Sequence, residues 1–540
     1  MGREGASHQG LWCDLPMAER AEEVSRTSTP GALVRSVCSL GSNQWSQALC
    51  LTVLTVSVYW PALQGVARAD QLIYLYQTRQ IHGLWPLISE TYALNRVGPV
   101  IGDAVLFRPV LYCVMAVERY LWGADFELWQ LTSLALHTAV VLSLFVYFRF
   151  ACVKAGQRDS SWPFVLALFF AMLYAGVEMV VWHHLAGYLL FCALAVGALL
   201  AYQHMVSGSM RAAVVLVLFV GLSCFTYELG NVLAVLIGVA VLVTAPKSHG
   251  GRRAGYFATA TLLVCLPVTY FAWSYGDYAT RHLPLAIGEP INVMSIAADL
   301  AISARFWTAS ALTPGAIQLM AGLRTGGGRI TAGPFAIFTT KGMLGVFLSI
   351  FISILCVFLW AKGRHILRDK WPPVVAAGAC VAYAGIIVLG REISRGVWPE
   401  LWGNSYYVYM FALFGIVAVF HWCLLPTMSA RQPDIRQCSR FLGYALATVA
   451  LIGATQITQV LAAMRAEYDL PFRRAYASIE TVRATGGYTL SADCPTAFRA
   501  PWLAPYLVDM AVPRDGYTVF TPLFPEQATS TTKPRTIACE

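Results

Sequence analysis

Residues 45–66 form an apolar run without a charged side chain, and the run is long enough to cross a bilayer as a helix. Further runs of the same kind follow, so that only 12% of all residues are charged while 57% are hydrophobic. A soluble protein has about twice that charged fraction. Because lipid cannot hydrogen-bond free backbone groups, these runs must be helical. The sequence therefore predicts an all-α membrane protein with about eleven transmembrane helices.

The predicted spans each contain an apolar window of about 19 residues. They are residues 45–66, 128–149, 162–182, 184–203, 211–228, 230–246, 255–273, 341–361, 373–390, 405–425 and 441–462. Lysine and arginine gather in alternate loops, and the short connections 181–184 and 227–230 contain neither. The basic loops are 149–158, 247–253, 362–370 and 431–440. By the positive-inside rule these loops are cytoplasmic.

This orientation predicts a multi-pass protein of the cell (inner) membrane, with a cytoplasmic N-terminus and an external C-terminus. Its parts are a disordered cytoplasmic tail, a polytopic membrane domain and a small external C-terminal domain: residues 1–44, 45–462 and 463–540. The loops 67–127 and 274–340 are also external. We expect residues 293–313 to form a surface or re-entrant helix, because a span there would place a basic loop outside.

The charges and cysteines bear on partners and covalent links. The net charge of +9 is spread over alternate loops and forms no single basic patch, which excludes a nucleic-acid partner. Cys494 and Cys539 are the only cysteines in residues 463–540. In an oxidising compartment they form a candidate disulfide, and two free thiols are the alternative.

An acid opens the loop after the first span. Asp70 stands where the first helix would leave the membrane, and residues 70–80 are predicted to form a loop helix. Asp70 can cap that helix. The alternative is a catalytic carboxylate held at the bilayer surface. Asp103, five residues before Arg108, is the second candidate for that role.

A second loop helix is predicted over residues 108–122, with Pro109 in its first turn. Its apolar positions recur at helical spacing and are Val110, Val114, Val117 and Leu121. We therefore expect this amphipathic helix to lie in the membrane interface, with Glu118 and Arg119 towards water.

These features, in this order, resemble the C-type membrane glycosyltransferases (GT-C fold). The resemblance is to the branch of the protein O-mannosyltransferases and the transmembrane-and-tetratricopeptide-repeat mannosyltransferases. The stretch FRPVLYCVMAVERYLW resembles the family's Arg-Pro helix, and His137 stands in the span that follows. Glu178, Val180 and Trp182 resemble a Glu-x-Val-x-Trp segment, and Glu228 resembles an acid at the end of a later span.

The resemblance implies an enzyme whose catalytic domain is residues 45–462. Such an enzyme is an inverting hexosyl- or related transferase. It moves a sugar from a polyprenyl-phosphate carrier to a glycan, lipid or protein acceptor at the external (periplasmic or lumenal) face. An oligosaccharide polymerase or ligase of the same fold and a multi-span transporter are the alternatives. The chain departs from the family where paired acids are common, since Asp70 lies between Ala69 and Gln71, and no repeat array follows the last span.

The implied chemistry assigns roles to the acids. An acceptor hydroxyl must lose a proton as it attacks the sugar, so a carboxylate is needed as general base. Asp70 is the first candidate, followed by Asp103. Glu178 and Glu228 lie at external ends of neighbouring predicted spans, and acids within a membrane are functional candidates. Paired structural carboxylates are the alternative for these two.

The leaving phosphate needs a fixed cation, and the arginine fork can bind two of its oxygens. The candidates are Arg108, Arg391 and Arg395, with snorkelling at the interface as the alternative for the last two. A divalent metal could bind His183 and His184. Adjacent helical histidines point about 100° apart, which disfavours a shared ion.

Reporter fusions test the predicted topology. A fluorescent protein that matures only in the cytoplasm should be bright at the N-terminus and dark at the C-terminus, because the two ends lie on opposite sides of the membrane. A bright C-terminal fusion would mean that the count of spans is wrong by one.

Overall fold

The computed structural model describes residues 44–65, 74–75, 78, 81–97, 107–123, 125–173, 175–246, 250–279, 371–395, 405–428, 433–469, 488–490, 508–514, 517–522 and 535–537. Its helical elements are α2 (Gln44–Tyr59), η3 (Trp60–Gln64), α4 (Leu84–Val97), α5 (Pro109–Trp122), α6 (Phe126–Lys154), α7 (Trp162–Ala171), α8 (Ala175–Val181), η5 (His183–Leu185), α9 (Ala186–Val206), α10 (Arg211–Thr226), α11 (Leu229–Thr244), α12 (Gly251–Ala279), α16 (Trp371–Arg395), α18 (Ser405–Val419), η8 (Phe420–Leu424), α19 (Leu425–Met428), α20 (Pro433–Met464) and η9 (Arg465–Asp469).

The described residues contain five helices that are long and apolar enough to cross a bilayer, so the chain is a multi-pass membrane protein. They are Gln44–Gln64, Phe126–Lys154, His183–Val206, Gly251–Trp273 and Gln437–Ala462. A sixth results if the bent pair of α7 and α8 is one span. The shorter apolar helices are Arg211–Thr226, Leu229–Thr244, Trp371–Tyr383 and Val408–Leu424.

The prediction of about eleven spans is therefore not confirmed. The four shorter helices coincide with predicted spans. Helices α10 and α11, with 16 residues each, have fewer than the about 20 residues that a full crossing needs, whereas α16 continues to Arg395. The predicted span 341–361 lies outside the described residues.

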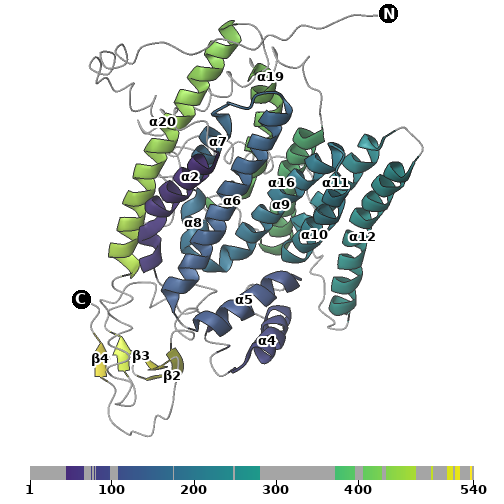
Figure 1. Ribbon diagram of the computed structural model, residues 1–540. Coiled ribbons are helices and arrows are strands. Elements are labelled where there is room, and N and C mark those ends of the chain that lie inside the picture. Colours follow the sequence, from purple (N-terminus) through teal and green to yellow (C-terminus); the bar gives the residue numbers. More distant parts are fainter. Residues whose placement is uncertain are drawn as a thin grey trace, which may run out of the picture. The chain divides into compact units, whose positions relative to one another are not determined.

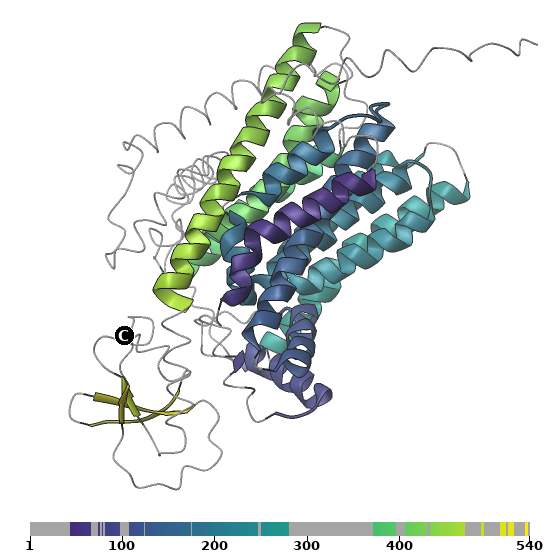
Figure 2. The same cartoon turned by 60° about the vertical axis from the view of Figure 1, so that its left-hand side comes forward.

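The helices pack into one apolar core. Helix α6 contacts α7, α8 and α9, and the chain of neighbours continues from α9 through α10, α11 and α16 to α18. Figures 1 and 2 show α6 and α9 side by side within this group. Large side chains such as Tyr147, Phe148 and Tyr202 are fully buried in it. This core gives a rigid frame for the connections at the ends of the helices.

Helices α7 and α8 meet at a bend of 61°. Such a break frees backbone carbonyls, which need a partner because lipid offers none. Tyr59 supplies one, since its hydroxyl lies 3.2 Å from the carbonyl oxygen of Ala171 and 3.3 Å from that of Leu173. The first span thus stabilises the bend.

Two loop helices, α4 and α5, pack side by side (Figure 1). Helix α5 agrees with the predicted helix 108–122. It starts with Pro109 and ends at Gly123, whose φ of 58° is a left-handed conformation that glycine adopts readily. Asp125 then caps α6 by accepting bonds from the backbone N–H groups of Glu127 and Leu128. Helix α4 was not predicted.

The predicted helix 70–80 is described at only a few positions. Tyr74 and Leu75 are helical, and the N–H of Thr78 donates to the carbonyl of Tyr74 at 3.0 Å. These positions agree with a helix.

The described membrane part is all-helical as predicted, and the C-terminal part adds a four-stranded sheet that was not predicted. The strands are β1 (Tyr488–Leu490), β2 (Val508–Arg514), β3 (Tyr517–Pro522) and β4 (Arg535–Ile537), in the order β2-β3-β1-β4. Strand β3 is antiparallel to β1 and β2, while β1 and β4 are parallel. The segment YTVFTP consists of aromatic and β-branched residues before its final proline, which favours a strand and could have indicated this sheet.

The close approach of α10 and α11 gives a stability test. A Cβ on Gly230 would clash with the backbone of Ser223 and Cys224, which cannot rotate away. We expect Gly230→Ala to lower the free energy of unfolding by about 1–3 kcal/mol, measured by thermal unfolding in detergent. Gly415 of α18 has open space around its Cα, so Gly415→Ala is the matched control and should be neutral or stabilising. Equal effects of the two changes would contradict this packing.

Candidate site at the start of loop helix α5

The three residues that begin α5 each have a separate anchor. Phe107 is buried, and its ring packs against Tyr270 and Trp273 of α12 at centroid distances of 5.4 and 5.2 Å. It also contacts Phe225 at 6.3 Å. Pro109 occupies the first turn of the helix, where its missing N–H costs nothing. The backbone of Arg108 is thus fixed between an aromatic cluster and a helix start.

The Arg108 side chain forms a two-point pair with Glu228, 120 positions later in the chain. Its Nε donates to Oε1 at 2.9 Å and its Nη2 to Oε2 at 2.8 Å. The guanidinium also lies over the ring of Tyr227 at 4.7 Å and near that of Tyr188 at 5.9 Å. Such cation–π contacts add to the ion pair. The structure therefore brings together two residues that the sequence predicted for different roles.

The pair is only partly shielded, with side-chain exposures of 12% for Arg108 and 28% for Glu228. Burial acts to lower the pKa of Arg108, but the Glu228 carboxylate and the tyrosines raise it, and the net pKa lies above its usual value. The guanidinium stays charged. Side-on pairing uses two of its five N–H donors, which leaves three for another anion. Glu228 precedes α11, where the helix dipole favours negative charge.

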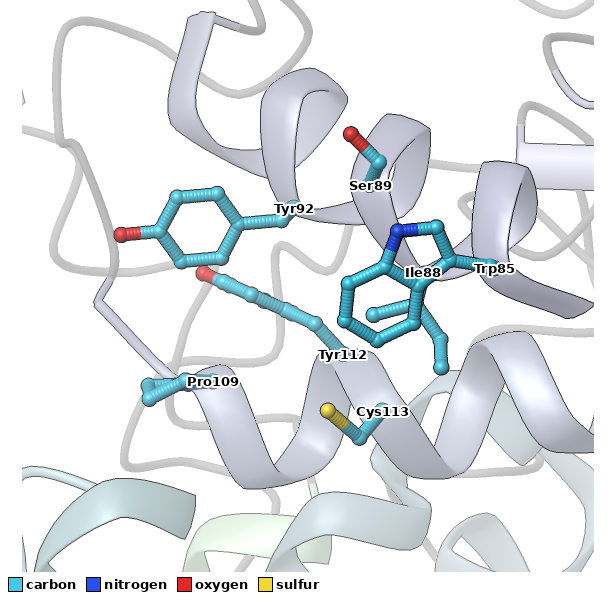
Figure 3. A pocket seen from close by; sticks show the side chains of 7 residues that line it. All are labelled: Trp85, Ile88, Ser89, Tyr92, Pro109, Tyr112 and Cys113. Atoms are coloured by element: carbon cyan, nitrogen blue, oxygen red, sulfur yellow. The ribbon is translucent and has the colours of Figure 1, made fainter.

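A pocket of about 220 Å³ lies between α4 and α5, and Pro109, the residue after Arg108, is part of its lining. Its lining is Trp85, Ile88, Ser89, Tyr92, Pro109, Tyr112 and Cys113. Figure 3 shows the hydroxyl groups of Tyr92 and Tyr112 turned away from Trp85 and Ile88. Burial raises the pKa of Tyr112 above its usual range, so its hydroxyl remains a donor. The pocket thus has an aromatic side and a hydroxyl-bearing side.

Glu118 contradicts its predicted exposure to water. It is 4% exposed, and its Oε2 lies 3.0 Å from Nε2 of His183 in η5. Nδ1 of the same ring lies 2.6 Å from Oγ of Ser133 in α6. On the same helix, Leu121 is 56% exposed and Val117 is also exposed. The helix therefore buries this acid together with the apolar side chains of Leu111, Tyr112 and Ala116.

The remaining predicted residues stay predictions. Asp70, Asp103, Cys494 and Cys539 lie outside the described residues. Arg391 and Arg395 lie at the end of α16, and their side chains are not among the described ones. Glu178 is half-buried in α8.

Metal binding is not supported by clustering within the described part of the chain, where His, Cys, Asp and Glu form no group of three. The imidazole of His183 has both nitrogens in the contacts with Glu118 and Ser133. A metal at His183 and His184 stays a prediction.

Sequence reasoning missed several residues of the site. The partners Ser133, Tyr188 and Tyr227 carry no local motif that marks them. Glu118 could have been found, since a single acid among apolar positions of a membrane-surface helix can also face a protein interior.

No protein-family model and no curated protein sequence matches the chain. Among solved structures, the chain is similar to the oligosaccharyltransferase of Archaeoglobus fulgidus. The form tethered with an acceptor peptide containing the NVT sequon is 13% identical, with a TM-score of 0.37 and coverage of 92% of this chain and 61% of that one. The apo form is 14% identical, with a TM-score of 0.39 and coverage of 85% and 59%.

A third structure is the archaeal oligosaccharyltransferase AglB from the same organism, in complex with an inhibitory peptide and a dolichol-phosphate. It is 13% identical, with a TM-score of 0.37 and coverage of 85% of this chain and 59% of that one. The chain thus spans about three fifths of the length of the structures it resembles.

The Arg108–Glu228 pair can be tested by a double-mutant cycle. We expect Arg108→Gln and Glu228→Gln each to destabilise the protein, because each leaves a shielded charge without its partner. The loss should stay below the about 3–5 kcal/mol of a fully buried pair, since Glu228 is partly exposed.

The double variant should lose less than the sum of the single ones, with a coupling of about 0.5–3 kcal/mol in detergent unfolding. Glu127→Gln removes an exposed carboxylate in the first turn of α6 and is the control, with an expected loss below about 1 kcal/mol. Strict additivity would mean that the two side chains do not interact.

Proposed function

We propose that the protein is a membrane glycosyltransferase that moves a sugar from a polyprenyl-phosphate carrier to an acceptor at the external face. The observation that carries this proposal is the partly shielded Arg108–Glu228 pair at the start of loop helix α5, a helix that also lines a pocket with aromatic side chains. The resemblance of the surrounding sequence to GT-C enzymes supports it.

The arrangement suits a substrate with an anionic phosphate and a sugar. Three N–H donors of Arg108 do not bond to Glu228 and can donate to phosphate oxygens, and the charge is held in place before substrate arrives. The pocket between α4 and α5 offers tyrosine and serine hydroxyls next to an indole ring. Small-molecule sites commonly combine such apolar walls with a few placed polar groups.

The proposed reaction is an inverting displacement. The acceptor hydroxyl oxygen forms a bond to the anomeric carbon, and the bond from that carbon to the phosphate oxygen breaks. The electron pair leaves with the phosphate, where Arg108 stabilises the developing charge. The acceptor proton passes to a carboxylate, for which Asp70 is the proposed general base.

The bend between α7 and α8 is the feature that would favour a transporter, because transporters use broken helices to bind ions. In this chain the hydroxyl of Tyr59 already contacts the carbonyls of Ala171 and Leu173 at the bend. This favours the transferase over the transporter.

Donor hydrolysis by the purified protein tests the function without knowledge of the acceptor. Incubated with a panel of polyprenyl-phosphate hexoses, the protein should release sugar from at least one, with water as a slow acceptor. Asp70→Asn should lower transfer about a hundredfold or more while the protein still folds, because the base is lost. Asp159→Asn, a change at an exposed acid, is the matched control. A folded Asp70→Asn protein with full activity would exclude Asp70 as the base.

A further inference from the structure

A chain of three polar side chains joins three elements of the structure. Glu118 of α5 contacts Nε2 of His183 in η5 at 3.0 Å, and Nδ1 of His183 contacts Oγ of Ser133 in α6 at 2.6 Å. The ring of Trp129 packs edge-on against His183 at a centroid distance of 4.9 Å. With both nitrogens bound and one face covered, the orientation of the imidazole is fixed.

A gain in stability alone does not explain why these three polar side chains are buried together. Glu118 and His183 have side-chain exposures of 6% and 2%, and Oε1 of Glu118 has no hydrogen-bond partner among the described residues. Replacing a buried ion pair by apolar residues of similar volume is often neutral or stabilising. What a polar pair adds is direction, because its hydrogen bonds fix one relative placement of α5 and the core.

That placement matters because α5 carries Arg108 at its other end. Ten residues separate Arg108 from Glu118, which is about 15 Å along a helix. A helix held at one point can pivot, whereas two anchors at this separation fix its axis. A third contact, from Nε of Arg119 to Oγ1 of Thr78 at 3.2 Å, joins α5 to the loop segment that follows Asp70.

We propose that Glu118, His183 and Ser133 are positioning residues that hold α5 so that Arg108 faces Glu228 and the incoming phosphate. The effect on transfer rests on the function proposed above. The docking of α5 does not, and it can be measured without substrate.

Two thiols on α5, one native and one introduced, can report whether this helix stays docked on the core. Ala116 is fully buried on this helix, whereas Cys113, one turn earlier, is exposed. With Ala116→Cys as the reporter, a membrane-impermeant maleimide should label the new thiol slowly and Cys113 quickly. Peptide-level mass spectrometry reads the two rates separately in the full-length protein.

Breaking the contacts among Glu118, His183 and Ser133 should expose the cysteine at position 116. In Glu118→Gln or His183→Gln we expect labelling at position 116 to rise about tenfold or more, as for the loss of a charge-assisted hydrogen bond, with Cys113 unchanged. Ser133→Ala removes one neutral bond, is the mildest variant and should give a smaller rise. Glu127→Gln, at an exposed carboxylate, is the matched control and should leave both rates unchanged.

Rescue separates positioning from packing. The swap Glu118→His with His183→Glu restores a carboxylate–imidazole contact and should restore protection. The apolar pair Glu118→Met with His183→Phe refills the volume and should leave the reporter labelled. Two results would overturn the proposal. One is a cysteine at position 116 that stays fully protected from labelling in the apolar double variant, and the other is full protection in both Ser133→Ala and Glu118→Gln.

An activity measurement distinguishes the proposed transferase function from the proposed positioning role. The donor is a polyprenyl-phosphate hexose that the parent protein hydrolyses. The variants of Glu118, His183 and Ser133 should raise KM for this donor more than they lower kcat, because Arg108 is misplaced for binding the phosphate. If the parent protein hydrolyses no donor, the proposed function is refuted. The labelling experiment would still test whether Glu118, His183 and Ser133 hold α5 in place. Active variants with unchanged KM and unchanged labelling would refute the positioning role of Glu118, His183 and Ser133.

Discussion

The two-point bond between Arg108 and Glu228 joins a loop helix to the turn between two membrane helices. It works because each side chain is placed by its own backbone: Arg108 between a buried phenylalanine and a helix-starting proline, Glu228 at the start of α11. Tyrosine rings cover the guanidinium and limit its contact with water. A fixed and partly shielded cation can bind an anion without first being ordered, which is the property that phosphate chemistry uses.

The same helix departs from the usual amphipathic pattern at one acid, which is buried together with the apolar side chains of Leu111, Tyr112 and Ala116. In water, the apolar face of a helix turns inward and its acids turn outward. In α5, Leu121 is exposed and Glu118 is buried against His183. Polar contacts therefore lie between α5 and the core, where each acts in a medium of low polarity and is directional. They specify how the helix docks, while apolar contact with lipid does not.

Much of the helical framework could be predicted from the sequence, because the apolar runs coincide with helices and Pro109 begins α5 as expected. Pairings across long separations could not, since nothing local links Arg108 to a residue 120 positions away. Arg108 and Glu228 were each identified as candidates, but their contact was not. Glu118 was placed on the wrong side because the helix was assumed to border water. The sheet was missed because its strands are short and widely spaced.

The outward apolar face of α5 has a consequence for the lipid around the protein. A helix with exposed side chains such as Val117, Tyr120 and Leu121 is expected to settle at a depth set by the hydrocarbon boundary. Helix α6, which begins four residues after α5 ends, runs from Phe126 to Lys154, or about 43 Å, and is longer than the about 30 Å hydrocarbon core. A thinner or thicker bilayer must therefore change the tilt of α6 while α5 follows the membrane surface. The angle between these helices, and with it the strain on their shared polar contacts, becomes a property of bilayer thickness as well as of the sequence.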